Sequence, residues 1–145
     1  MLTTEQATVV AQETLAEAKR RGFAPLCCAV LDPGGHPIAV LRDETASISR
    51  AEIATAKAAG CLGMGFGGRE LAARAEKMPQ FFNSLAAVFP KGIVALPGGV
   101  LLRDASGALV GAAGVSGDTS DNDEIALLAA VEKAGLKAQT GAKPE

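Results

Sequence analysis

One histidine is the residue of this sequence with the clearest capacity for chemistry. His36 is the only histidine in the 145 residues, so a catalytic triad or a metal site that requires two histidines is ruled out. It follows a Gly-Gly pair, at the junction between a predicted turn and a predicted strand. In that place it is either an exposed hairpin residue without a role or a group that acts alone. The roles open to it are axial ligand of a haem iron and single acid or base.

Two basic residues are candidates for holding the carboxylate of a ligand. Arg42 ends a predicted strand and precedes Asp43, and Lys57 lies in the middle of a predicted helix. A guanidinium and an ammonium group, together with backbone N–H groups, suit a small carboxylate or a haem propionate. The predicted cofactor-binding site therefore includes Arg42 and Lys57, and we add the glycine pair Gly98 and Gly99.

A glycine-rich stretch, residues 111–124, runs from an apolar strand through a turn into an acidic helix start. Its glycines have no side chain, so either another element of the protein or a ligand can lie close to their backbone. We include Ser116 and Gly117 in the predicted site because their backbone is placed to line a pocket. Three carboxylates follow, Asp121, Asp123 and Glu124. They are expected to be favourable charges in a first helical turn, with a weak divalent-metal or iron site as the alternative.

Two further patterns predict structure rather than chemistry. The pattern Gly63-x-Gly65-x-x-Gly68 has the form of a dinucleotide-binding fingerprint, but it follows a predicted helix where the fingerprint must follow a strand. We interpret it as an interruption between helices. The three cysteines are Cys27, Cys28 and Cys61. They are odd in number and form no Cys-x-x-Cys pair, so buried structural thiols are expected.

Composition indicates one ordinary globular domain over residues 1–145. Apolar residues make up 48% and charged residues 21%, and the formal net charge is −2. With only 3% aromatic residues and no basic surplus, a nucleic-acid partner is not expected. No apolar stretch approaches the roughly 20 residues of a membrane span, and the first residues do not form a secretion signal. We therefore predict a cytoplasmic protein without a membrane partner.

Helices are predicted from caps and apolar spacing. A capping box of Thr3 and Gln6 opens the first helix, and Gly22 ends it. A second box, Ser49-x-x-Glu52, opens the next helix, which the glycines at 63–68 interrupt. Further helical segments are predicted over residues 69–77, over residues 80–88 and from a cap at Ser120. The buried face of the last helix is predicted to hold Ile125, Leu127, Leu128 and Val131.

Strands are predicted where short apolar runs end at turn residues. The predicted strands cover residues 25–31, 36–42, 93–96, 100–103 and 109–115. The turns at 32–35 and 104–107 make two of the connections hairpins. A polar tail from Gln139 is expected to fray. Five strands with three main helices predict a layered α+β domain.

Several motifs together resemble one known family. They are Val30-Leu-Asp32-x-Gly-Gly-His36, Arg42-Asp43, Ala54-x-x-Lys57-Ala58, Pro97-Gly-Gly-Val100, and Gly111-x-x-Gly-Val-Ser-Gly117 followed by Asp123-Glu124. In combination, over nearly the whole chain, these motifs resemble the GlcG/HbpS-like family, which also supplies the C-terminal domain of PduO proteins. The resemblance implies a profilin-like, three-layer domain with a five-stranded antiparallel sheet between helices. It also implies assembly into homo-oligomers.

The resemblance implies a small-ligand-binding protein, with haem as the expected cofactor. No haem ligand carries over from the family, so His36 as the iron ligand is a hypothesis from its chemistry. The alternative is a small-molecule catabolic enzyme, a lyase or isomerase acting on a small carboxylate or carbonyl compound. In that enzyme His36 or an acidic residue is the base, and Arg42 or Lys57 holds the substrate. A third interpretation is an accessory scaffold whose oligomer is the function, so the sequence leaves open whether the protein is an enzyme.

Overall fold

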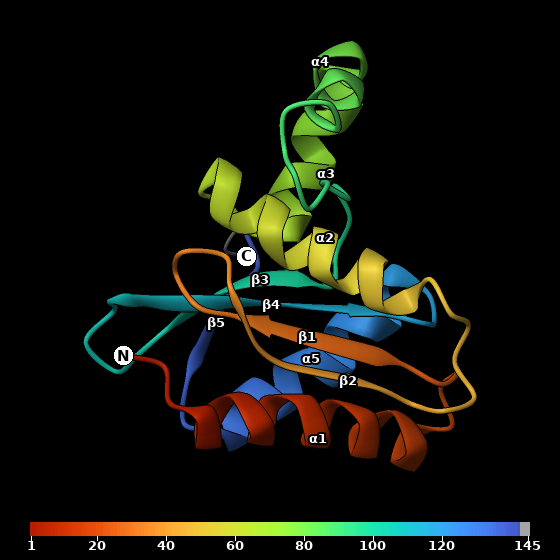
Figure 1. Cartoon of the computed structure of the whole chain (residues 1–145), viewed down its shortest axis with the longest axis vertical. Helices are drawn as coiled ribbons and strands as arrows, with labels where there is room; N and C mark the ends of the chain where they lie inside the picture. The colour runs from red at the N-terminus through yellow and green to blue at the C-terminus, as the bar shows by residue number, and fades with distance from the viewer. Residues whose placement is uncertain (143–145) are drawn as a thin grey trace.

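The computed structural model describes residues 1–142, which fold into a layered α+β structure (Figure 1). Its elements are α1 (Thr4–Arg21), β1 (Cys27–Leu31), β2 (Pro37–Arg42), α2 (Arg50–Met64), α3 (Gly68–Lys77), α4 (Pro79–Leu85), β3 (Gly99–Arg103), β4 (Leu109–Ser116), α5 (Ser120–Lys133) and β5 (Lys137–Gln139). No helix among residues 1–142 combines the length and the apolar character that crossing a bilayer requires.

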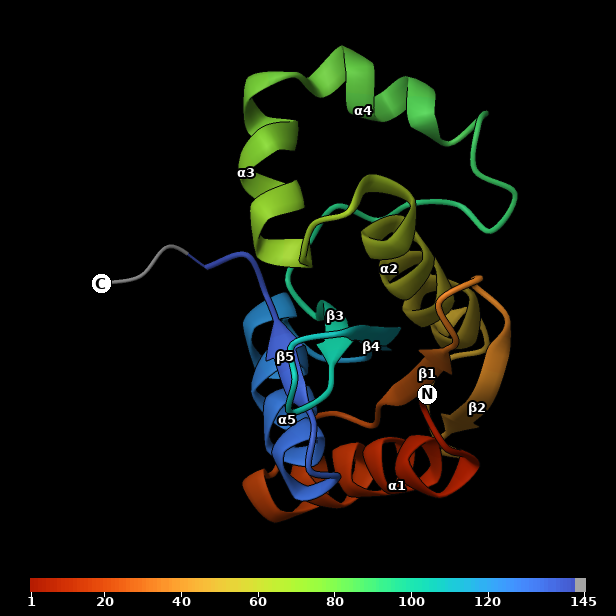
Figure 2. The same ribbon diagram turned by 90° about the vertical axis from the view of Figure 1, so that its left-hand side faces the viewer.

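The strands form one antiparallel sheet in the order β2-β1-β4-β3-β5. Two hairpins, β1–β2 and β3–β4, lie side by side because β1 pairs with β4, and β5 adds to the outer edge of β3. Helices α1 and α5 cover one face of this sheet and α2 covers the other (Figures 1 and 2). Helices α3 and α4 extend beyond α2, away from the sheet. This confirms the predicted profilin-like fold.

The apolar core lies on both faces of the central strands. Every residue of β1 is buried, as expected for a strand that is covered by helices on both sides. Cys28 packs in the cluster beneath α1 and α5, and its neighbour Cys27 packs against Ala54 of α2. All three cysteines are free and buried, and burial raises the pKa of the Cys28 thiol to about 12. They are the structural thiols that the sequence predicts.

Helix α2 packs directly on the backbone of the sheet. A Cβ atom added to Gly114 of β4 would lie 2.1 Å from the carbonyl oxygen of Ala54, and one added to Gly99 of β3 would lie 2.7 Å from that of Lys57. Both approaches are too close for any side chain. Gly114 of the 111–124 stretch therefore serves helix packing, while Gly111 lies against the carbonyl oxygen of Leu31 on β1, so both have the close packing that was one of the two uses the sequence allowed.

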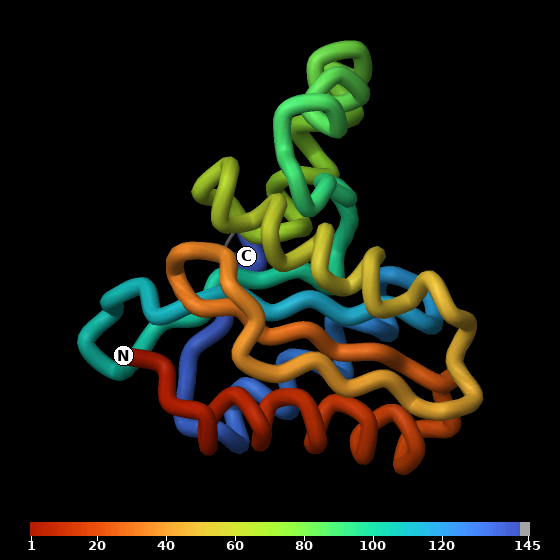
Figure 3. The backbone as a smooth tube through the Cα atoms, viewed as in Figure 1, coloured from red at the N-terminus to blue at the C-terminus, as the bar shows by residue number. Residues whose placement is uncertain are grey.

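The fifth strand was predicted in the wrong place. Residues 93–96 do not pair with a strand; Ile93 instead packs on Gly60 of α2. Figure 3 shows this segment running from α4 back past α2 toward β3. The fifth strand is β5, which includes Gln139, so the predicted frayed tail begins within the sheet. Residues 93–96 are apolar because they pack against a helix. A short apolar run of this kind has the same sequence pattern as a buried strand, so periodicity alone does not distinguish the two.

The predicted helix starts have mixed outcomes. The Thr3–Gln6 capping box is confirmed, with Gln6 N–H donating to Thr3 Oγ1 at 3.0 Å. The predicted box at Ser49 is wrong, because the Ser49 backbone has φ −85° and ψ 0° instead of extended angles and its side chain caps nothing among the described residues. The cap of α5 is Thr119 rather than Ser120, accepting the Asn122 N–H at 3.2 Å. The prediction that Ile125 lies on the buried face of α5 is also wrong, because this residue is 39% exposed.

Candidate functional site

The predicted site residues lie at two opposite ends of the sheet. Strand β1 pairs Cys27 with Ser116 and Leu31 with Ala112, so the hairpin tip that carries His36 lies at the other end from Ser116. Arg42 lies at the Ser116 end, in register with Cys27. The Ser116 end also holds four other residues of the predicted site, namely Lys57, Gly98, Gly99 and Gly117. The structure therefore separates the one histidine from the rest of the predicted site.

A buried ion pair is the centre of the cluster at the Ser116 end. Lys57 Nζ lies 3.2 Å from Asp123 Oδ2, and the two side chains are 3% and 2% exposed. Asp123 Oδ1 also accepts the backbone N–H of Asp118 at 2.9 Å. Burial lowers the pKa of Lys57 and raises the pKa of Asp123. Their ion pair opposes both effects, as expected for charges that are removed from water together.

Two glycines of the predicted site, Gly98 and Gly117, lie close to other protein atoms, and Gly98 lies against the ion pair. Gly98 has φ +103°, and a Cβ there would lie 3.0 Å from Lys57 Nζ. Gly117 lies against the backbone just before β1, where a Cβ would be 2.2 Å from the Pro25 carbonyl oxygen. Protein atoms thus lie where a side chain at either position would have to be. Neither glycine lines the cavities described below.

The remaining polar residues of the cluster are engaged with protein groups. Arg50 Nη1 donates to Ser116 Oγ at 3.0 Å, and Ser116 is 1% exposed. Arg42 Nη1 donates to the carbonyls of Asp43 at 3.2 Å and Ala46 at 2.7 Å, which holds the loop after β2. Arg42, which was predicted to hold a ligand, therefore uses Nη1 on this loop.

The carboxylates of α5 pair with cations on other helices. Asp121 and Glu124 both accept hydrogen bonds from Arg69 of α3, each with a shortest distance of 2.8 Å, while Asp123 pairs with Lys57. Among the described residues, no group of three or more His, Cys, Asp or Glu side chains has the proximity to hold a metal ion. These three carboxylates join helices, a role that the first-turn interpretation did not include.

Sequence reasoning missed that Asp123 is a buried ion-pair partner, although a signal was present. Asp123 precedes Leu127 by four positions and Ala130 by seven, and both of these are buried. Helical spacing therefore places Asp123 on the buried stripe of α5. A carboxylate on such a stripe requires a cationic partner.

His36 stands in an arrangement suited to binding a ligand. Its Nδ1 lies 3.3 Å from Asp32 Oδ1, and its side chain is 76% exposed. The N–H groups of Gly34 and His36 donate to the same Asp32 oxygen at 2.9 Å and 3.0 Å, and these hydrogen bonds hold the pKa of Asp32 below its ordinary value. With Nδ1 directed at a carboxylate, Nε2 is the nitrogen available to a ligand.

A cavity of about 360 Å³ lies beside this hairpin tip. Its lining residues are Pro33, Gly34, Gly35, Ala59, Leu62, Gly63, Phe89, Pro90 and Lys91. The imidazole of His36 lies over Gly34, where an added Cβ would be 3.0 Å from Nδ1. Lys91 Nζ donates to the Gly35 carbonyl oxygen, which ties the segment after α4 to the hairpin. The arrangement combines an apolar wall, one cation and one available imidazole nitrogen.

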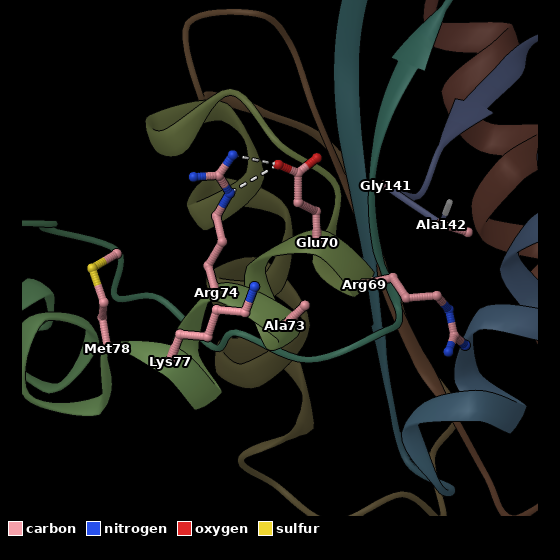
Figure 4. A pocket seen from close by; sticks show the side chains of 8 residues that line it. All are labelled: Arg69, Glu70, Ala73, Arg74, Lys77, Met78, Gly141 and Ala142. Carbon is pink, nitrogen blue, oxygen red and sulfur yellow. Dashed lines mark hydrogen bonds and ion pairs between the residues drawn. The ribbon is translucent and has the colours of Figure 1, made fainter. Parts of the chain in front are cut away.

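A second and larger cavity, of about 860 Å³, lies beside α3 (Figure 4). It is lined by Arg69, Glu70, Ala73, Arg74, Lys77, Met78, Gly141 and Ala142. None of these residues belongs to the predicted site. Sequence reasoning missed this cavity because its walls come from α3 and from the segment after β5, which only the tertiary structure brings together.

Comparisons with known proteins agree on one family. The family described as "Haem degrading protein HbpS-like" matches residues 2–132. The crystal structure of a PduOC–haem complex is 21% identical, with a TM-score of 0.80 over 97% of this chain and 99% of that one. The crystal structure of HbpS is 29% identical, with a TM-score of 0.77 over 91% of this chain and 89% of that one.

A third solved structure has the same fold. Klebsiella pneumoniae protein ORFY is 21% identical, with a TM-score of 0.80 over 92% of this chain and 90% of that one. No curated protein matches the chain in sequence.

Proposed function

Because this chain belongs to the HbpS-like family, we propose that it binds haem, with His36 as the ligand of the iron. The observation that carries the proposal is the pairing of His36 Nδ1 with Asp32 Oδ1 at 3.3 Å, next to Gly34 and Gly35, which line an apolar cavity. The pairing orients the imidazole and leaves Nε2 available. A carboxylate behind a ligating histidine also raises its basicity toward a metal.

The donor set fits haem better than a bare metal ion. A transition-metal ion held by protein alone needs several ligands, and residues 1–142 bring no three His, Cys, Asp or Glu side chains together. Haem supplies its own equatorial nitrogens, so a single protein ligand is enough. A bound haem would supply a redox-active iron; the protein's part is to bind, orient and shield it.

The neighbouring residues suit the rest of the haem. Leu62 and Phe89, with two prolines, form an apolar wall beside the hairpin, which favours contact with the porphyrin edge. Lys91 lies at the same rim and is exposed. Its ammonium group is placed to pair with a propionate while it still donates to Gly35.

Titration of the purified protein with hemin tests this proposal. We expect a saturable shift of the Soret band in the wild type, a much weaker shift in His36→Ala, and partial recovery on addition of free imidazole. Asp32→Asn should keep the shift but weaken binding about tenfold, because the imidazole loses its orienting carboxylate. Met78→Leu, which removes the only sulfur atom among the residues that line the larger cavity, is the control and should bind as the wild type does.

Haem binding and iron ligation by His36 are contradicted by different results. A wild type without a Soret shift would contradict haem binding, and an unchanged shift in His36→Ala would contradict His36 as the ligand. A shift lost only in Met78→Leu would move the haem to the α3 cavity. We also propose, from the family resemblance, that the chain forms a homo-oligomer; sedimentation that shows only monomer would contradict this.

A further inference from the structure

We propose that the cavity beside α3 is a second binding site, for a small organic anion that has an apolar body. It shares no lining residue with the cavity beside His36. Its volume of about 860 Å³ lies within the range of small-molecule sites, roughly 300–1,000 Å³. The proposal does not depend on haem binding.

The site has a fixed backbone frame. The N–H of Arg69, at the start of α3, donates to the carbonyl oxygen of Thr140 at 3.0 Å. Two glycines allow this crossing, because a Cβ on Gly67 would lie 2.2 Å from the carbonyl carbon of Thr140, and one on Gly141 would lie 2.5 Å from Cβ of Glu70. The segment after β5 is therefore held against α3 by backbone contacts, and it forms one wall of the cavity.

One side of α3 supplies most of the remaining lining. Positions 69, 70, 73, 74 and 77 contribute, separated by the three and four residues that bring side chains to one face of a helix. Ala73 and Met78 are apolar, and the aliphatic stems of the arginines and the lysine add to this surface. A ligand with an apolar body matches these walls.

The charge of the lining favours an anion. Three cations, Arg69, Arg74 and Lys77, face one acid, Glu70. Arg69 turns toward α5, where Glu124 and Asp121 bind it, and Figure 4 shows it pointing away from the other cations. Glu70 offsets the charge of Arg74, so the net positive charge that remains at the cavity is that of Lys77.

These two cations keep donors for a ligand. Arg74 uses Nε and Nη2 on Glu70, each at 2.8 Å, and its guanidinium lies 4.0 Å above the ring centre of Phe66, which fixes its plane. Lys77 follows three positions later and forms no ion pair with the residues that the structure describes. A carboxylate or sulfonate bound between Arg74 Nη1 and Lys77 Nζ would accept hydrogen bonds from both groups.

Fluorescence titration with 8-anilinonaphthalene-1-sulfonate, an amphipathic anion, tests the site. We expect saturable enhancement with the wild type, binding about tenfold weaker in Lys77→Gln and Arg74→Gln, and weaker binding in Ala73→Phe, whose ring takes up part of the cavity. Lys133→Gln, a matched exposed lysine on α5, should bind as the wild type does. Circular dichroism checks that each variant is folded, because this dye also binds partly unfolded chains.

The role of the charge is tested with N-phenyl-1-naphthylamine, which has a similar apolar body without the sulfonate. It should bind the wild type more weakly than the anion does, with no change in Lys77→Gln. Equal dye binding by the wild type, Lys77→Gln and Ala73→Phe would overturn the proposal. The same variants titrated with hemin should behave as the wild type, so failure here and failure of the His36 proposal give different results.

Discussion

Lys57 and Asp123 meet at 3.2 Å in the interior although they come from helices on opposite faces of the sheet. Lys57 lies on α2 and Asp123 in the first turn of α5. The contact is possible because Gly98, at the end of the segment before β3, has no side chain in the space that the lysine ammonium needs. One buried contact therefore joins the two helical layers.

Breaking this pair from one side should be costly. Asp123→Leu leaves the Lys57 ammonium buried without a partner, and we expect a loss of about 3–5 kcal/mol in the free energy of unfolding, measured in urea. The double variant Lys57→Met/Asp123→Leu removes both charges and should recover most of that loss. If the double variant loses as much unfolding free energy as the two single variants lose together, the two side chains are not energetically coupled.

Asp118 should control part of the acid stability. The N–H groups of Ala24 and Thr119 donate to its carboxylate at 2.7 Å each, and these hydrogen bonds lower the pKa of Asp118 in the folded state. A folded pKa below the unfolded value means that the stabilisation is present above the unfolded pKa and is lost as the pH falls through the folded pKa. Asp118→Asn should therefore flatten the decline in unfolding free energy between about pH 5 and pH 2.

The control for this prediction is Glu132→Gln, which changes an exposed carboxylate near the end of α5. It should leave the slope of stability against pH unchanged. An Asp118→Asn variant with the wild-type slope would contradict the role assigned to the hydrogen bonds.

Gly114→Ala should displace α2 from the sheet. The added methyl would lie 2.1 Å from the Ala54 carbonyl oxygen and 2.8 Å from the Ala58 nitrogen, both of which are backbone atoms that cannot move aside alone. We expect a loss of about 2 kcal/mol or more by thermal or urea unfolding. Gly60→Ala is the comparison, because there the nearest atom to the methyl is Ile93 Cγ1 at 2.7 Å, which belongs to a side chain that can rotate, and helix propensity improves. Equal losses in both variants would contradict this explanation.

Arg69 should anchor α3 to α5. Its guanidinium binds Glu124, which is 7% exposed, so Arg69→Met leaves a nearly buried carboxylate without its cation. We expect a loss of about 1–3 kcal/mol and faster hydrogen exchange at the amides of α3. Arg74→Met breaks the exposed pair with Glu70 on the same helix and the cation–π contact with Phe66, and it should cost about 0.5–1 kcal/mol. Wild-type exchange in Arg69→Met would show that α3 is held by other contacts.

Local chemistry made much of this protein predictable from its sequence. The capping box of Thr3 and Gln6, the turns after Leu31 and Arg103, and the buried thiols all depend on neighbouring residues or on the apolar character of a short run. The motif combination also indicated the family and the antiparallel sheet between helices. Such features need no knowledge of what lies across the fold.

Only the tertiary structure decided which distant residues meet. Lys57 and Asp123 are 66 positions apart, and nothing local to either residue specifies the other. The apolar run at 93–96 packs on α2 instead of forming a strand, while the polar segment Lys137–Gln139 pairs with β3. His36 lies at the opposite end of β1 from Ser116 for the same reason, since strand register sets which residues of a sheet lie together. Local propensity leaves these choices open, and the packing of the whole chain settles them.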